Sequence, residues 1–394
     1  MSVCPDVLFQ DITTFDTGKG FCVLRSKACL LPPVQIVHVG FSCKDVSSLN
    51  KHSKSARYCI RKSSLRTGGT FAGAVAFVSQ LRPVLVLLEN VAALDRCDTR
   101  TGVSSAHDVR DIFAELGYIL CDSVCNAMFH GVPHRRTRWW AVAVQVSASP
   151  VTDEDVIAHR EAIGDFHNAL DLLRVAPVPL DSILMCEGSE ELGLWQADRL
   201  REAARSQGEE GDDELSRVEQ EAEGQLGKEK DTDKAAGRAK RPNWPELHAE
   251  HFRTQDLRYP PVYSLLYSTE EQARLRVLPL WAREIVYYFD SLLGRATVEE
   301  VIEVSQSICR VPRMTAGLPC CTPRNLLWLR KRFRLVQANE ALQAQGVRLR
   351  TRSEVAGFSG AELSSLAGSA FSAYTSQVVS IAALASFRVF KPLF

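Results

Sequence analysis

The feature that most constrains this chain is a succession of three segments between residues 34 and 88. Val34–Val39 and Val84–Leu88 are short, mostly apolar runs of strand length. Between them, Phe71–Leu81 has small and apolar residues at helical spacing and ends before Arg82 and Pro83, which stop a helix. A strand, a helix and a strand in this order predict two parallel strands in a sheet that is covered on both faces.

The alternation of helix and strand continues to about residue 146. Ala106–Tyr118 predicts an amphipathic helix, with Asp108 near its N-terminal end and Gly117 as its C-terminal cap. Its apolar stripe consists of Val109, Ile112, Phe113 and Leu116. Tyr118–Ala127 and Arg138–Val146 read as two further strands that pair antiparallel. The first 150 residues therefore predict an α/β fold.

Beyond about residue 147 the pattern weakens. Residues 205–241 are rich in charge, acidic first and basic later, with few large apolar residues and no aromatic ones. This composition predicts a disordered or solvated insertion. Order resumes near Trp244, with a helix expected around Pro279–Leu293, and residues 310–394 again have the composition of a globular segment.

Charge and cysteine content exclude several classes of protein. The formal net charge is zero, which argues against a uniformly polybasic nucleic-acid binder but allows local basic patches. The 12 cysteines are scattered, and neither Cys121/Cys125 nor Cys320/Cys321 has a second pair at zinc-site spacing. The sequence shows no secretory signal and no apolar run close to the ~20 residues of a membrane span. We therefore expect an intracellular protein with free thiols, no metal and no membrane segment.

Three short motifs lie at the ends of the predicted strands. Gly40–Cys43 follows the first strand, Glu89–Val91 follows the second, and Gly131–Trp140 leads into the last. Because ligands of an open α/β sheet gather at the carboxyl ends of its strands, the first two motifs are expected in one crevice. Each motif alone is ordinary, since a cysteine after a strand is usually a small buried hydrophobe and an arginine-rich turn is usually a surface.

Together and in this order, the motifs resemble the catalytic cysteine loop, the ENV motif and the GVPQxRxR motif of the DNA cytosine-5 methyltransferase family. The late segments CTPRNLLWLRKRFRLVQANEALQAQG and LAGSAF are similar to the family's last motifs. The resemblance covers about 30–145 and 310–385. It implies a Rossmann-like catalytic core in residues 1–146, a variable target-recognition region in 147–309 that contains the insertion 205–241, and a return to the core in 310–394.

The resemblance also implies a role for each matched side chain. Cys43 would add to C6 of cytosine as a thiolate, so that C5 becomes nucleophilic enough to accept a methyl group, and would later leave by elimination. Glu89 would hold a proton toward N3 of the base, and burial would raise its pKa in the useful direction. Asn90 would fix the loop, while Arg136 and Arg138 would orient the base, the glutamate or a phosphate. The base must leave the DNA stack to reach Cys43, so a flipped cytosine is implied.

Basic residues after the cysteine loop indicate phosphate contact. From Val46 to Leu88 there is no acidic residue, which would favour the thiolate form of Cys43. A solvated surface is the alternative, and phosphate contact would weaken steeply with salt. The six candidate cations are Lys51, Lys54, Arg57, Arg61, Lys62 and Arg66. A second basic run, read either as a contact with the DNA backbone or as a helix face, consists of Arg324, Arg330, Lys331, Arg332 and Arg334.

The resemblance implies S-adenosylmethionine as the cofactor. The family binds it through an N-terminal FxGxGG loop, and no such loop precedes Cys43, so the sheet is expected to be incomplete at its N-terminal side. Asp11, in VLFQDITTF, would lie toward the adenine. Ser369 and Ala370, in LAGSAF, would complete the cofactor site.

Three functions remain open at this stage. Ser42 stands where the family has proline before the cysteine, His134 where it has glutamine, and Ser369 where it has asparagine. The first function is DNA cytosine-5 methylation on double-stranded DNA, in the nucleus of a eukaryote or the cytoplasm of another cell. The second is a catalytically inactive DNA-binding or regulatory relative. The third is cytosine-5 methylation of tRNA, which one branch of the family carries out.

Overall fold

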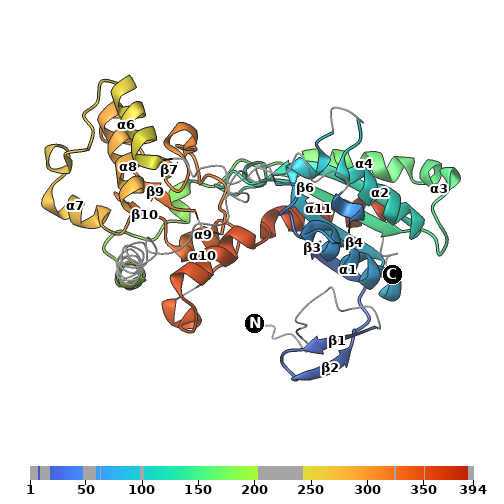
Figure 1. Cartoon of the computed structure of the whole chain (residues 1–394). Coiled ribbons are helices and arrows are strands. Elements are labelled where there is room, and N and C mark those ends of the chain that lie inside the picture. The colour runs from blue at the N-terminus through green and yellow to red at the C-terminus, as the bar shows by residue number, and fades with distance from the viewer. Residues whose placement is uncertain are drawn as a thin grey trace, which may run out of the picture. The chain divides into compact units, whose positions relative to one another are not determined.

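The computed structural model describes residues 8, 18–47, 59–62, 64–97, 102–202, 243–323, 325–349 and 351–388. The chain divides into two compact units (Figure 1). Unit 1 consists of Met1–Val132, Arg136–Pro177 and Phe371–Phe394, and unit 2 of Pro133–Arg135 and Val178–Ala370. The expected insertion at 205–241 lies outside the described residues, and the division into a catalytic core and a target-recognition region stays a prediction.

A four-stranded sheet with the order β3-β4-β6-β5 forms the centre of unit 1. β3 (Ile36–Gly40) and β4 (Leu85–Val91) run parallel and are connected through α1 (Arg66–Leu81). β5 (Tyr118–Asn126) and β6 (Thr137–Gln145) pair antiparallel, and β6 also pairs antiparallel with β4. The predicted strands, the helix between the first two and the α/β class are therefore confirmed, and the sheet is mixed.

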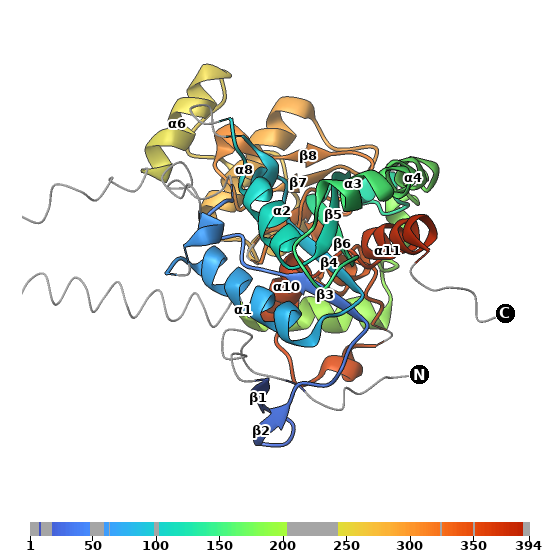
Figure 2. The ribbon, with the colours of Figure 1, turned by 90° about the vertical axis from the view of Figure 1, so that its right-hand side faces the viewer.

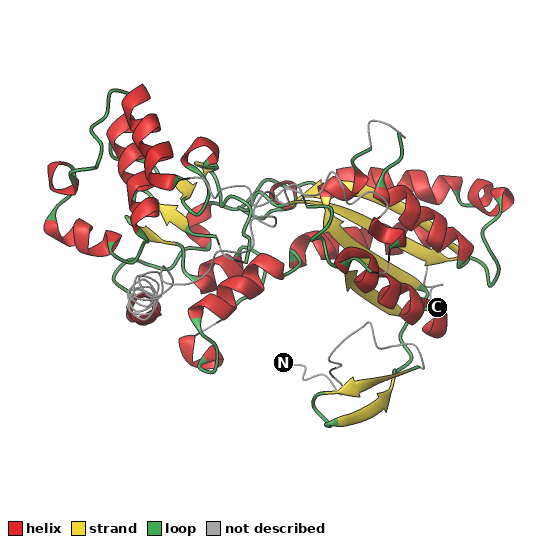
Figure 3. Ribbon diagram, in the orientation of Figure 1, coloured by secondary structure: helices red, strands yellow, loops and turns green. Residues whose placement is uncertain are grey.

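Helices cover both faces of this sheet, as Figures 2 and 3 show. Val86 of β4 packs in one apolar cluster with Phe71 of α1, whereas Leu87 packs in another with Phe166. Successive side chains of a strand point to opposite faces, so the first four residues of β4, Leu85–Leu88, are all apolar because both faces are buried. The covering helices are α1 and α2 (Ser105–Glu115) on one face, and α4 (Arg160–Leu172) and α11 (Ala373–Phe387) on the other. A short helix, α3 (Asp153–Ala158), precedes α4.

The helix ends of unit 1 follow local chemistry. α1 begins at Arg66, earlier than predicted, and the Asp45 carboxylate accepts a hydrogen bond from the Thr67 N–H in its first turn at 2.7 Å. It ends as predicted, with Arg82 in the left-handed region at φ 49°. The hydroxyl of Ser104, rather than Asp108, caps α2, and Gly117 follows that helix at φ 80°. A separate antiparallel hairpin consists of β1 (Lys19–Cys22) and β2 (Lys27–Leu30).

Unit 2 combines helices with a small sheet of the order β10-β9-β7-β8. Its strands are β7 (Val301–Glu303), β8 (Arg313–Met314), β9 (Leu327–Leu329) and β10 (Arg334–Leu335). Residues 190–202 of this unit are helical, and its further helices include α6 (Trp244–Thr254), α7 (Thr269–Leu275), α8 (Leu280–Leu293), α9 (Ala338–Gln343) and α10 (Gly360–Ser369). α8 confirms the helix expected around Pro279–Leu293.

Two arginines of the second basic run, Arg330 and Arg334, fit neither the expected contact with the DNA backbone nor the expected helix face. Arg330 follows β9 in a turn and Arg334 begins β10; their side chains are 4% and 3% exposed, and each pairs with carboxylates. Arg330 pairs with Asp290 at 2.7 Å and with Glu300, and Arg334 pairs with Glu340 at 2.8 Å. Charges buried in this way need partners, so these arginines are internal ion-pair residues, not DNA contacts or a helix face.

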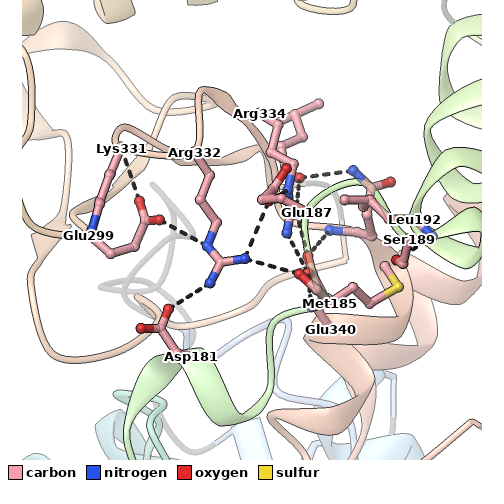
Figure 4. A network of polar contacts seen from close by, with 12 residues as sticks. Asp181, Met185, Glu187, Ser189, Leu192, Glu299, Lys331, Arg332, Arg334 and Glu340 are labelled. Atoms are coloured by element: carbon pink, nitrogen blue, oxygen red, sulfur yellow. Dashed lines mark hydrogen bonds and ion pairs between the residues drawn. The ribbon is translucent and has the colours of Figure 1, made fainter.

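Arg332 extends the same network at its edge (Figure 4). Its guanidinium pairs with Asp181 at 2.7 Å and with Glu187 and Glu299 at 3.3 Å each. Only Lys331 of the described run is exposed, and Arg324 lies outside the described residues. The described run therefore lies in the turn between β9 and β10 and at the start of β10, not on a helix.

One described segment, Gly360–Phe387, has the length and hydropathy of a membrane span. The sequence prediction found no such run. The segment is divided between α10 and α11, which belong to different units, and each packs in the core of its own unit. Leu363 lies in a cluster of unit 2, and Val379 lies against the sheet of unit 1. The apolar character of the segment is thus explained by two protein cores.

Candidate active site

The pairing of three strands brings the three sequence motifs to one edge of the unit 1 sheet. Gly40, the last residue of β3, lies opposite Glu89 in the parallel ladder. Arg138 of β6 lies opposite Val91 in the antiparallel ladder. Cys43 follows β3 directly, so the thiol, the carboxylate and the guanidinium come from the neighbouring ends of three paired strands, as expected for the first two motifs.

The loop that carries Cys43 is fixed from two sides. The Ser42 N–H donates to the Thr70 hydroxyl at 2.9 Å, and the N–H of Asp45 donates to the Thr67 hydroxyl at 3.1 Å. From the other side, the amide of Asn90 donates to the Phe41 carbonyl at 3.0 Å. The sequence analysis did not identify either threonine. Two hydroxyls within the first five residues of the helix that follows a cysteine loop could have indicated hydrogen bonds to the backbone of that loop.

Gly40 is needed because an aromatic ring lies against its backbone. A Cβ at this position would stand 2.6 Å from Cε1 of Phe371, whose ring lies 6.1 Å from that of Trp140. Phe371 is the last residue of the LAGSAF segment. This segment therefore contributes to the site by packing beneath the strand that leads to Cys43, a contact that the sequence did not indicate.

Glu89 is a buried carboxyl held beside cations. Its side chain is 12% exposed, and Oε1 lies 3.1 Å from Nε of Arg138. Burial raises the pKa of Glu89, and the charges of Arg136 and Arg138 act against that rise. The direction is the one expected from its place at the end of an apolar strand. A carboxyl whose pKa is raised can keep a proton for a hydrogen bond to a base.

The environment of Cys43 differs from the expectation of a stabilised thiolate. Burial raises the pKa of this thiol; Arg138 lowers it, Glu89 raises it and Arg136 lowers it. The cations that act on Cys43 thus come from strand β6 and the segment before it, the opposing carboxyl comes from β4, and desolvation outweighs the arginines in the free protein.

The basic residues of 46–66 fall into three groups. Lys51, Lys54 and Arg57 lie outside the described residues. The Arg61 guanidinium pairs with Asp108 at 2.6 Å and with Asp111 at 3.4 Å. Lys62 and Arg66 are exposed, as Arg61 is.

His134 anchors the short segment Pro133–Arg135, which belongs to unit 2. Its side chain is fully buried, and Nε2 accepts the Cys321 N–H at 3.0 Å. On either side, the Arg135 N–H donates to the Leu318 carbonyl and the Leu318 N–H donates to the Pro133 carbonyl, both at 2.8 Å. The histidine therefore acts as a hydrogen-bond acceptor, a role that the side-chain carbonyl of a glutamine can also fill.

The described residues do not fit a glycine-loop site for S-adenosylmethionine. TGKGF enters the β1–β2 hairpin, and TFAGAVAF lies within α1, so neither forms a glycine loop between a strand and a helix in the described chain. Asp11 lies outside the described residues. Ser369 is exposed at the end of α10, Ala370 follows it half-buried, and both belong to unit 2. Within the described ranges no group of three or more potential metal ligands occurs.

Comparison with known proteins identifies the family. No curated protein matches the chain significantly. Among solved structures, it is similar to the Entamoeba histolytica methyltransferase EhMeth at 10% identity, with 90% of this chain and 78% of that chain covered and a TM-score of 0.39. A Spodoptera frugiperda DNMT2 mutant matches at 11% identity, with 91% and 80% covered and a TM-score of 0.34. The Schizosaccharomyces pombe Dnmt2 methyltransferase matches at 15% identity and a TM-score of 0.24, with 39% of this chain and 40% of that chain covered.

At these TM-scores the solved structures do not identify the family of the chain. The family model, by contrast, covers most of the sequence. The model described as C-5 cytosine-specific DNA methylase matches residues 4–252, more than half of the chain. The matched range contains the cysteine loop, the ENV motif and both arginines of the third motif. The chain therefore belongs to the C-5 cytosine-specific DNA methylase family.

Proposed function

We propose that this chain methylates C5 of a flipped cytosine in double-stranded DNA through a covalent bond to Cys43. The observation that carries the proposal is the convergence of Cys43, Glu89 and Arg138 at the ends of three paired strands. A nucleophile beside a buried carboxyl of raised pKa suits an aromatic ring that must be attacked at one atom and protonated at another.

The residues of the chain divide the first step between them. The Cys43 thiol loses its proton to solvent and its sulfur bonds to C6, while the electrons of the C5–C6 double bond move toward C5. Glu89, in its protonated form, donates to N3 and so makes C6 more electrophilic. Arg138 is a positioning residue for Glu89 and also lowers the pKa of Cys43. Loss of the C5 proton and cleavage of the C6–S bond restore the aromatic ring.

S-adenosylmethionine supplies the methyl group in this family when it is bound. The described residues do not form its characteristic loop. The Cys43 step can be tested without it, because an adduct at C6 exchanges the hydrogen at C5 with solvent. We also propose an intracellular location, which would be the nucleus in a eukaryote.

The test is exchange of the cytosine C5 hydrogen in deuterated water, measured by mass spectrometry on duplex DNA with the full chain. We expect exchange by the unaltered chain and a loss of roughly 100-fold or more in Cys43→Ser. Cys97→Ser, a change at an exposed cysteine, is the matched control and should exchange normally. Exchange that persists in Cys43→Ser, with Cys97→Ser unaffected, would refute the role of Cys43.

A second set of measurements separates the remaining functions. Salt-sensitive duplex binding without any C5 exchange would identify an inactive DNA-binding relative. Methyl incorporation from S-adenosylmethionine, followed with duplex DNA and tRNA in competition, distinguishes the two substrates. Preferential methylation of DNA supports the proposal, and preferential methylation of tRNA replaces it with the RNA function.

A further inference from the structure

In unit 2, the side chain of Cys309 lies against a histidine. Nε2 of His251, in the last turn of α6, stands 2.9 Å from Sγ of Cys309. Cys309 belongs to a short 3-10 helix, Ile308–Arg310, and is exposed, while His251 is half-buried. This distance places an imidazole nitrogen in hydrogen-bond reach of a thiol, the arrangement by which a histidine activates a cysteine nucleophile.

Buried neighbours hold the two side chains in place. Phe252, next to His251, is fully buried, and Ile308, next to Cys309, is 5% exposed; both belong to one apolar cluster. The ring of Tyr288 meets that of His251 edge-on at 6.4 Å. Burial raises the pKa of Tyr288, and Cys309 adds to that rise. The pair is thus built on the core of unit 2 rather than on a freely moving loop.

We propose that Cys309 is a reversible modification site that undergoes thiol–disulfide exchange with low-molecular-weight disulfides. His251 takes the thiol proton at Nε2, and the Cys309 sulfur attacks one sulfur of the disulfide. A new S–S bond forms, the old one breaks, and the departing thiolate takes the proton from His251. Cys309 is oxidised and the small disulfide is reduced by the same two electrons, so no further reactant is needed.

Solvent access distinguishes this thiol from the candidate catalytic one. Cys43 is partly buried at the sheet edge of unit 1, whereas Cys309 is an exposed residue of unit 2. A bulky disulfide therefore reaches Cys309 without entering the proposed cytosine site. The proposal is independent of the proposed methyl transfer and can succeed or fail without it.

The test uses the full chain and oxidised glutathione, with the modified peptides quantified by mass spectrometry over time. Cys97 and Cys186 are also exposed and serve as internal references. We expect Cys309 to form its mixed disulfide roughly tenfold faster than either reference. In His251→Gln the rate at Cys309 should fall to that of the references, and in the control His107→Gln, at an exposed histidine of α2, it should not change.

Two outcomes would overturn the proposal. The first is a Cys309 rate equal to that of Cys97 and Cys186 in the unaltered chain, a result that needs no variant to fold. The second is an undiminished rate in His251→Gln whose thermal unfolding matches the unaltered chain. His251→Asn provides a second variant with a shorter side chain, and it should slow Cys309 to the same extent.

Discussion

Nε of Arg138 lies 3.1 Å from Oε1 of Glu89, across the antiparallel pairing of β6 and β4. The contact joins the second and third sequence motifs, which are separated along the chain by α2 and β5. Both side chains are largely buried, so the ion pair is weakly screened by solvent. Arg138 acts on Cys43 in addition, which makes it the link between the proposed nucleophile and the proposed proton donor.

Replacing Arg138 should move the pH dependence of C5 exchange upward. Arg138 lowers the pKa of both Glu89 and Cys43, so Arg138→Gln raises both pKa values. Exchange requires Glu89 to hold its proton and Cys43 to lose one. The rising limb of the pH–rate profile therefore follows the pKa of Cys43 and the falling limb that of Glu89, and both limbs lie at higher pH in the variant. At neutral pH the rate should fall by roughly 100-fold. An unshifted profile, equal to that of the control Arg135→Gln at an exposed arginine, would contradict this role.

Gly40→Ala should destabilise the chain. The new methyl group would lie 2.6 Å from the Phe371 ring, and overpacking of this kind costs about 1–3 kcal/mol of unfolding free energy. Gly164→Ala is the matched control, because nothing lies within 4 Å of its added Cβ and the exposed site is inside α4, where alanine is favoured by roughly 0.5–1 kcal/mol. Denaturant unfolding of the two variants measures the difference. In a Phe371→Leu background the cost of Gly40→Ala should shrink, and an unchanged cost would rule out this steric origin.

Arg330→Met should destabilise the chain by about 3–5 kcal/mol. Asp290 and Glu300 would lose the buried cation that they share, while the apolar stem of the side chain is preserved. The neighbouring exposed residue supplies the comparison, since Lys331→Met should stay within about 0.5 kcal/mol of the unaltered chain. Equal unfolding midpoints for the two variants in urea would show that the Arg330 pairs contribute no net stability.

Lys62→Gln and Arg66→Gln should weaken duplex binding without affecting folding. Both side chains are exposed, and each phosphate contact that is lost should reduce the slope of log K against log salt by about 1. Fluorescence anisotropy over a range of salt concentrations measures the slope. Arg160→Gln, at an exposed arginine where α4 begins, should leave it unchanged. A constant slope in the Lys62 and Arg66 variants would leave these residues as part of a solvated surface.

Short sequence patterns were sufficient to predict the central strands and helices of unit 1. Val84–Leu88 could be recognised as a strand because both of its faces are buried, and Arg82-Pro83 stops α1 by backbone geometry. The pairing of Gly40 with Glu89 follows from two parallel strands with functional residues at their ends. By contrast, the run of arginines at 330–334 could not be interpreted from the sequence, because its partners Asp290 and Glu340 come from other segments.

The sequence was enough to predict the family, the order of strands and helices in unit 1, and which thiol and carboxyl follow the two parallel strands. These properties depend on residue type and spacing over short distances. Three features follow from the folded arrangement alone: Phe371 underlies Gly40, Thr67 and Thr70 hold the cysteine loop, and burial raises the pKa of Cys43. Contacts between distant segments and desolvation depend on how the chain is packed, and spacing along the sequence carries no information about either.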